Sequence, residues 1–386
     1  MKKILLFIVC ITSSIVLFGQ THSSADKLFQ EGEYGAAQEA YGALLKRYPT
    51  EALYLYRYAR CAQELGDDTT AIQYFEAFNQ VQRSSKLETN IDVARMTLAY
   101  SYLNKGEYEK ALAQIQDLLA NTTATILPKE DVLTNGFNNV DSENWIWGQD
   151  VTIENTSALA SFFGQVDIYS YSYASAGDVK GIDANLLAEI DANVWDVRRG
   201  WWGNYYAQKN EASYEYAPDG KFFSAKSKEL MGDRNWLSDN VFMRIETAYL
   251  IAAEAAYREN NYPLAAEYLT KITDERVKEG QEAAYAAYKA TLTDSKVLEE
   301  AIYYNWRVEL WGEGHTFFDI KRLNMSVTRG YEGTNWADSQ SQLNTNGRPA
   351  WTNYVIVATE AANNAALVNY NNPDPSDAYA PWAANN

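Results

Sequence analysis

Apolar residues recur every three or four positions through the first third of the chain, as they do in amphipathic helices. Residues 52–65 and 68–80 show this pattern on either side of a short polar link that contains Gly66. The link recurs twice, because Gly32, Gly66 and Gly106 are each followed five positions later by an alanine. Glycine ends a helix at positive φ, and alanine lets the next helix approach closely. The pattern therefore predicts paired helices joined by tight turns.

These helical pairs form a repeat. The three glycines are 34 and 40 residues apart, and residues 260–265 carry a fourth copy in which Asn260 replaces glycine. Asparagine also tolerates the left-handed conformation. One helical hairpin cannot bury both of its faces, so several have to stack. The spacing resembles the tetratricopeptide repeat and predicts an all-α fold with about four hairpin units. An unrelated bundle of α-hairpins is the alternative.

Two regions break the helical pattern. Residues 124–240, which we call the aromatic-rich insertion, and the loop-rich tail 326–386 are rich in Asn, Gly, Ser and aromatic residues. A long irregular segment in a compact protein is usually functional or disordered, and so many rings disfavour disorder. We therefore expect helical repeats in residues 21–123, an ordered ligand-binding insertion on that scaffold, further helices in 241–325, and a tail that packs on the body.

The helices of residues 241–325 carry a specific resemblance. In residues 242–256, Arg244 follows Phe242 by two positions, and a Tyr-Leu pair precedes Ala-Glu-Ala. This segment resembles the SusD/RagB family motif aromatic-x-Arg-x-x-Glu-x-Tyr-Leu-x-x-Ala-Glu-Ala, with its first Glu one position early. Residues 265–276 and 301–322 resemble two further motifs of that family, the second with Trp in place of a Glu before Arg. The segment 360–373 resembles the family's ending loosely.

The resemblance implies a function. Members of that family are outer-membrane lipoproteins that capture glycans or other nutrients and close over a TonB-dependent transporter of the SusC type. Their helical repeats face the transporter, and the variable region binds the ligand. By this resemblance we expect a SusD-like carbohydrate-binding protein, not an enzyme, with a SusC-type transporter and a glycan or other small nutrient as partners. An exported tetratricopeptide scaffold for envelope assembly, without a small ligand, is the alternative.

Charge and the N-terminus limit the partners and the location. The net charge is −18 with no cluster of Lys and Arg, which disfavours nucleic acid as a partner. Residues 1–20 resemble a signal peptide, with two Lys before an apolar run. We expect an exported protein at the outer membrane, with the periplasm as a second possibility. Family members carry a lipidation Cys after that run, whereas Cys10 lies inside it, so we expect a mature start near Gln20 or Thr21 without lipid.

The available chemistry favours binding over catalysis. The chain has two histidines, and Cys61 is the one cysteine after the signal, so we expect no catalytic residues, no metal and no cofactor. Aromatic rings stack on sugars, and amides and guanidinium groups bind hydroxyls. The predicted ligand-binding residues are Arg199, Trp201, Trp202, Asn204, Tyr205 and Tyr206, with Trp145 and Trp147 as a second cluster beside Asn144. The alternative is that these rings pack the insertion onto the repeats.

Overall fold

The computed structural model describes most of the chain between residues 22 and 372. The described residues are 22–49, 51–80, 88–134, 137–152, 155–167, 172–174, 176–178, 180–203, 215–218, 222, 238–329, 331, 345, 347–349, 352–367 and 371–372. The expected signal peptide lies outside them, as do the predicted ligand contacts Asn204, Tyr205 and Tyr206.

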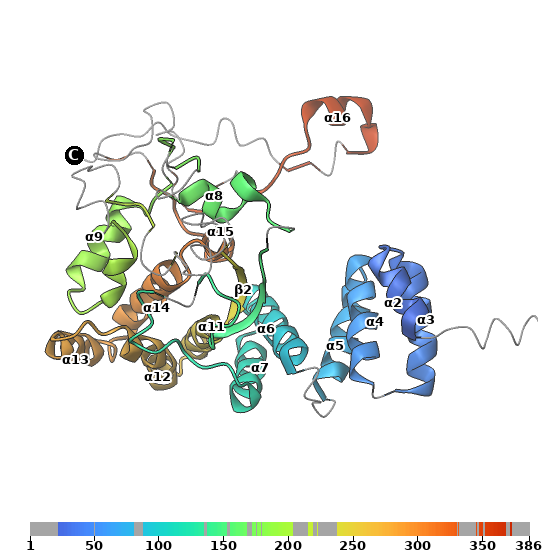
Figure 1. Cartoon of the computed structure of the whole chain (residues 1–386), viewed down its shortest axis with the longest axis horizontal. Helices are drawn as coiled ribbons and strands as arrows, with labels where there is room; N and C mark the ends of the chain where they lie inside the picture. Colours follow the sequence, from blue (N-terminus) through green and yellow to red (C-terminus); the bar gives the residue numbers. More distant parts are fainter. Residues whose placement is uncertain are drawn as a thin grey trace, which may run out of the picture. The chain divides into compact units, whose positions relative to one another are not determined.

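The chain divides into two compact units, which are described separately (Figure 1). The first comprises the residues up to Tyr102 together with Ala113–Thr122. Its helices pack as consecutive pairs, α2 with α3, α3 with α4 and α4 with α5. The helices of the repeat region are α2 (His22–Gln30), α3 (Tyr34–Arg47), α4 (Ala52–Glu64), α5 (Asp68–Gln80), α6 (Glu88–Lys105) and α7 (Tyr108–Asn121).

The turns have the geometry that the repeat predicts. Gly32, Gly66 and Gly106 adopt φ values of 77°, 76° and 76°, and Asn260 adopts 60°. A side chain with a Cβ atom is disfavoured in this left-handed region, which is why Gly or Asn stands there. The alanines five positions after the glycines are buried, as close helix approach requires. The predicted helical hairpins are confirmed.

The first unit has a core of its own. Tyr41 is buried among Ala25, Ala37 and Leu44, and its hydroxyl donates a hydrogen bond to Asp26. Cys61 belongs to the same cluster. Burial raises the pKa of its thiol to about 11, which keeps it protonated and unreactive at neutral pH.

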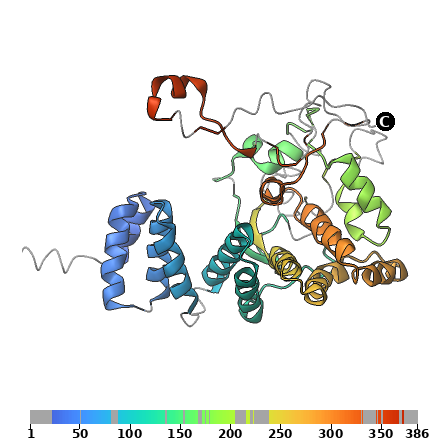
Figure 2. The same ribbon diagram turned by 180° about the vertical axis from the view of Figure 1, so that it is seen from behind.

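The second unit contains the remaining helices and a two-stranded sheet. In it α11 packs on α12 and on α14 (Figure 2). The side chains of Asp183, Asn261 and Asp294 cap the N-termini of α9, α12 and α14 by accepting hydrogen bonds from backbone N–H groups of the first turn. These capping residues determine where the three helices begin. Its helices are α8 (Phe162–Val166), α9 (Ala184–Ala192), α11 (Ile245–Arg258), α12 (Tyr262–Thr273), α13 (Glu282–Thr291), α14 (Ser295–Glu309), α15 (His315–Arg322) and α16 (Ala358–Asn363).

The described part of the insertion contains short elements and buried aromatic residues. Strand β1 (Trp145–Gln149) pairs antiparallel with β2 (Asn240–Arg244), which leads directly into α11. The described part of the insertion also contains the 3₁₀ helices η1 (Ala158–Ala160) and η2 (Val197–Trp201). Many of its buried apolar residues belong to one cluster that includes Phe137, Phe163 and Phe222, whereas Trp195 packs in a second cluster with Val277 and Tyr285. In the part of the chain that the structure describes, no helix has both the length and the apolar character of a membrane span.

Candidate functional site

A buried set of ion pairs holds the insertion against the C-terminal helices. We call it the arginine–carboxylate network. At its centre lies Glu309, at the end of α14, with a side chain that is 1% exposed. Its carboxylate accepts hydrogen bonds from Arg198 at 3.0 Å, from Arg244 at 2.8 Å, and twice from Arg276, at 2.9 and 3.0 Å. The other members are Asp196, Glu246 and Glu313.

Electrostatics keep the central carboxylate, that of Glu309, ionised. Burial on its own favours the neutral form of the Glu309 carboxyl. The guanidinium groups of Arg276, Arg244 and Arg198 outweigh that effect and hold the pKa of Glu309 well below its usual range. Glu246, also buried, accepts hydrogen bonds from the backbone N–H of Leu127 and from the side chain of Asn144. The network therefore fixes the chain immediately before β1.

Trp201 and Trp202 lie inside the second unit. They are 1% and 0% exposed, and both belong to the aromatic core cluster. The indole N–H of Trp201 donates to the backbone oxygen of Val132 at 2.7 Å. In this conformation neither ring offers a face to a ligand from solvent.

Arg199 and the neighbouring glycine also make internal contacts. The Arg199 side chain contacts Asp191 at 2.6 Å and donates to the backbone oxygen of Trp202 at 3.0 Å. Gly203 has φ of 72°, and a Cβ there would lie 2.3 Å from the backbone oxygen of Glu215. Gly203 thus allows a close approach between two segments of the chain's own backbone.

Strand β1 has one buried and one exposed face. Ile146 is buried, whereas Trp147 is 46% exposed. The ring of Trp145 lies over Gly148, where an added Cβ would come within 2.3 Å of it. Glycine in a strand often permits such a close approach. The pairing of β1 with β2 is irregular between Trp145 and Gly148, which helps to turn the ring of Trp147 outward.

Trp147 pairs with Phe242 of β2 on the exposed face. Phe242 is 48% exposed, and the two ring centroids lie 4.9 Å apart at an interplanar angle of 57°. Beside them, the Asn240 side chain donates to Gln149 Oε1 at 3.3 Å. We call Trp147, Phe242, Gln149 and Asn240 the aromatic platform. It places two rings and two amides on one solvent-facing surface.

The base of this platform is firmly held. Buried Asp239, the residue before β2, accepts the backbone N–H of Val151 at 2.7 Å and that of Val140 at 2.9 Å. Arg244 at the other end of β2 belongs to the arginine–carboxylate network. Because both strands are fixed at their ends, the rings are positioned before a ligand arrives.

Of the predicted site residues, the structure therefore exposes Trp147 and leaves Trp145 half-buried beside it. It does not bring Trp147 together with Trp201 or Trp202 in a shared core cluster. Sequence reasoning missed Phe242 as a site residue and placed it only in a helix motif. The strand pairing that brings it to Trp147 joins segments far apart in sequence. Local sequence gives no clear signal for it, because the residues of β2 do not alternate regularly between buried and exposed positions.

The chemistry of this surface is that of binding. Exposed rings offer apolar stacking faces, and amides both donate and accept hydrogen bonds. Within the described residues, no group of three or more His, Cys, Asp or Glu is arranged to hold a metal ion. His315 is half-buried against Trp306, and this partial burial lowers its pKa.

Comparison with solved structures supports the fold. A SusD superfamily protein from Bacteroides thetaiotaomicron VPI-5482 is similar over 79% of this chain and 73% of its own, with 17% identity and a TM-score of 0.54. A SusD-like carbohydrate binding protein from Bacteroides vulgatus ATCC 8482 is similar over 77% and 70% of the two chains, with 20% identity and a TM-score of 0.52. At these identities the likeness concerns the fold.

Comparison of the sequence with family models identifies the family of the chain. No curated protein sequence matches the chain. The tetratricopeptide repeat model matches residues 23–80, within the region where α2 to α5 form consecutive helical pairs. The SusD family model matches residues 122–378, which is well over half of the chain and contains the aromatic platform and the arginine–carboxylate network. The chain therefore belongs to the SusD family.

Proposed function

We propose that this protein is a cell-envelope receptor that captures a glycan on its aromatic platform. The observation that carries the proposal is the exposed pair of Trp147 and Phe242 beside two amide side chains. Sugars present C–H faces that stack on rings and hydroxyls that bind amides. A structural relative of this fold is described as a SusD-like carbohydrate binding protein, which supports the same ligand class.

The proposal assigns the platform a role that the buried rings cannot play in this conformation. Trp201 and Trp202 support the core, and Trp147 and Phe242 contact the ligand. Asn204, Tyr205 and Tyr206 stay predicted ligand contacts, since they lie outside the described residues. Their alanine variants belong in the same assay as those of the platform.

The test is a glycan screen followed by calorimetry on variants. We expect Trp147→Ala and Phe242→Ala each to weaken binding of the glycan found by about 2 kcal/mol, because few rings carry most of such an interface. Tyr354→Ala is the matched control, since Tyr354 is an aromatic residue 86% exposed elsewhere on the surface. Unchanged affinity in both platform variants would remove the platform from the proposal. A screen without any glycan ligand would favour the scaffold alternative.

We further propose that the receptor works with a SusC-type TonB-dependent transporter at the outer membrane. Family membership supports this partner, and the helical repeats supply a surface for a protein contact. Co-expression with the SusC-type protein encoded nearest to this gene, followed by purification through either partner, tests the complex. Purification of each protein alone, with and without the glycan, would contradict the partnership.

We propose export through the N-terminal signal, with a mature chain that starts near Gln20 or Thr21. Mass spectrometry of the protein recovered from cells tests both the start and the anchor. A mass that corresponds to diacylated Cys10 would contradict the proposed start.

A further inference from the structure

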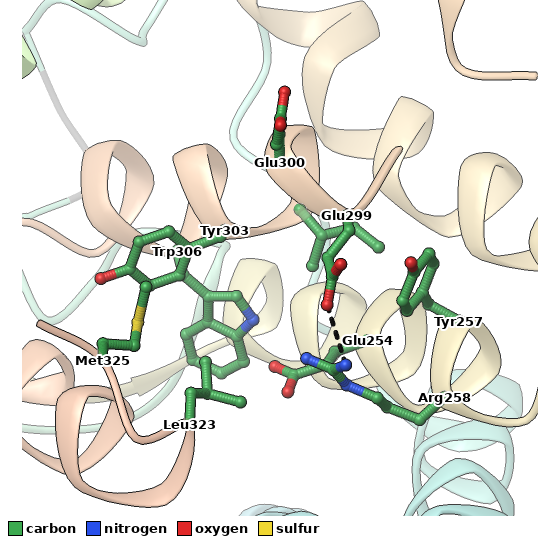
Figure 3. Close-up of a pocket in the computed structure, with 10 residues that line it drawn as sticks. Glu254, Tyr257, Arg258, Glu299, Glu300, Tyr303, Trp306, Leu323 and Met325 are labelled. Atoms are coloured by element: carbon green, nitrogen blue, oxygen red, sulfur yellow. Dashed lines mark hydrogen bonds and ion pairs between the residues drawn. The ribbon is translucent and has the colours of Figure 1, made fainter. Parts of the chain in front are cut away.

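A pocket of about 250 Å³ lies in the second unit, between α11, α14 and the segment that follows α15 (Figure 3). Trp306, Leu323 and Met325 lie together on its apolar side, as Figure 3 shows, and Ile302 also lines the pocket. None of these residues belongs to the aromatic platform, so the pocket is a separate feature of the molecule. Its volume is close to the lower end of the range for small-molecule sites, which suits one ring-sized group.

The opposite end of the pocket is charged. There the Arg258 guanidinium donates to Glu299 Oε1 at 2.8 Å and lies near Glu254, as Figure 3 shows. Glu254 is in turn bound by Arg322, whose Nη2 donates to it at 2.7 Å. Glu300 at the rim is exposed, and Lys296 comes no closer to it than 3.8 Å.

Negative charge is in excess around this cavity. Three carboxylates and one guanidinium line it. Arg322, which does not line the pocket, forms an ion pair with Glu254. It also forms an ion pair with Asp319, so its positive charge is shared between two carboxylates. The whole chain carries a net charge of −18, which adds to the negative potential.

Two aromatic rings of the lining already hold cations of the chain itself. Arg258 lies 5.5 Å from the ring centroid of Tyr257, and Arg322 lies 5.6 Å from that of Trp306. A cation close to a ring face is attracted by the negative charge density of that face. The pocket thus combines an apolar wall, aromatic rings and surplus carboxylates.

We propose that this pocket binds an amino sugar, a ring-sized ligand with a free ammonium group. The apolar wall with Trp306 and Leu323 packs on the C–H face of the ring, and Glu299 and Glu300 attract the ammonium. The choice of a sugar rests on the proposed function of the protein. The choice of an ammonium rests on the charges of the pocket itself. A neutral hexose can pack on the apolar wall, but it has no ammonium group for the carboxylates to attract.

Two variants with opposite expected effects test the proposal on the full-length protein, with D-glucosamine as the probe. Glu299→Gln removes a carboxylate and releases the Arg258 guanidinium into the pocket, so binding should weaken about three- to fivefold. Arg258→Gln leaves Glu299 without its cation, so binding should strengthen by about the same factor. If Glu299 and Arg258 only supported the fold, both replacements would weaken binding. Calorimetry or saturation-transfer NMR gives the affinities.

Controls separate the charge effect from other causes. D-glucose and N-acetyl-D-glucosamine carry no ammonium, so both should bind more weakly than D-glucosamine and respond little to either variant. Glu282→Gln replaces an exposed carboxylate on α13 outside the pocket and should leave all affinities unchanged. Weaker glucosamine binding in both pocket variants, equal binding of the three sugars, or no saturable binding of glucosamine would each overturn the proposal.

The outcome is also distinguishable from that of the platform. Trp147→Ala should leave glucosamine binding at the pocket unchanged, because Trp147 is not among the residues that line it. Loss of the glycan ligand of the platform with intact glucosamine binding would overturn the proposed function alone. If Glu299→Gln and Arg258→Gln did not change glucosamine affinity in opposite directions while the platform still bound its glycan, the pocket proposal alone would be overturned.

Discussion

Replacement of Glu309 by Gln is the sharpest test of the arginine–carboxylate network. The substitution keeps the shape of the side chain and removes one buried negative charge. In the native protein the two carboxylate oxygens accept four hydrogen bonds, from Arg198, Arg244 and Arg276. An amide has a single oxygen, and its NH₂ group would face guanidinium groups that only donate.

The expected cost is large because the three arginines stay buried. Their side chains are 0%, 3% and 1% exposed. Removal of one partner from a buried ion pair typically costs about 3–5 kcal/mol, since the remaining charge is left without full compensation. We expect Glu309→Gln to lower the free energy of unfolding of the second unit by that amount. Such a loss is a large part of the stability of an ordinary domain.

Urea unfolding followed by tryptophan fluorescence measures this loss. All eleven tryptophans lie at or after Trp145, so the signal reports on the second unit. Glu300→Gln on the surface of α14 is the control and should change stability by less than about 0.5 kcal/mol. Equal urea midpoints for Glu309→Gln and the native protein at neutral pH would refute the reasoning.

The pH dependence gives a second check on the same variant. The pKa of Glu309 is depressed in the folded state, so its stabilisation is present above the unfolded pKa of about 4.3. That stabilisation is lost as the pH falls below this value toward the folded pKa. The difference in stability between the native protein and Glu309→Gln should therefore shrink in acid.

Three further predictions use the same unfolding assay. Ala111→Arg should cost about 2–4 kcal/mol, because Ala111 is fully buried near the start of α7 in the third repeat and its site cannot accommodate a long charged side chain. An unchanged urea midpoint would contradict this packing. Trp201→Ala should cost about 3–5 kcal/mol through loss of a buried ring, and selective loss of ligand binding in a fully stable variant would contradict that expectation. Burial raises the pKa of Asp319 to about 6 against the opposing effect of Arg322. The stabilisation linked to protonated Asp319 is therefore fully present below about pH 4 and is lost as the pH rises to about 6. An Asp319→Asn variant whose stability follows the same pH profile as the native protein over that range would argue against this titration.

Local chemistry made the helical part of the fold predictable. The turn at Gly32, Gly66 and Gly106, and again at Asn260, depends on a backbone conformation that few residue types adopt, so the sequence spacing marked each turn. The family motif in residues 242–256 likewise coincides with a strand end and the helix α11. Both signals lie within a few consecutive positions, which is why a single sequence was enough to find them.

The ligand surface depended on contacts that the sequence does not show. Trp201 and Trp147 are both tryptophans next to a glycine, yet one is buried and the other is exposed. What separates them is tertiary structure. Trp201 meets Val132 and the aromatic core, whereas Trp147 lies on the outer face of β1 opposite Phe242. Composition identified the rings, and only the strand pairing showed which of them face solvent.

The platform and the network are connected through the two strands. Asn144, directly before Trp145 on β1, donates to Glu246, and Arg244, two residues after Phe242 on β2, binds Glu309. Both strands are thus attached to the same set of buried charges at positions within three residues of the rings. Release of Arg244 from Glu309 would free the end of β2 and leave buried charges without full compensation. The charges that stabilise the core therefore also hold the strands that carry Trp147 and Phe242.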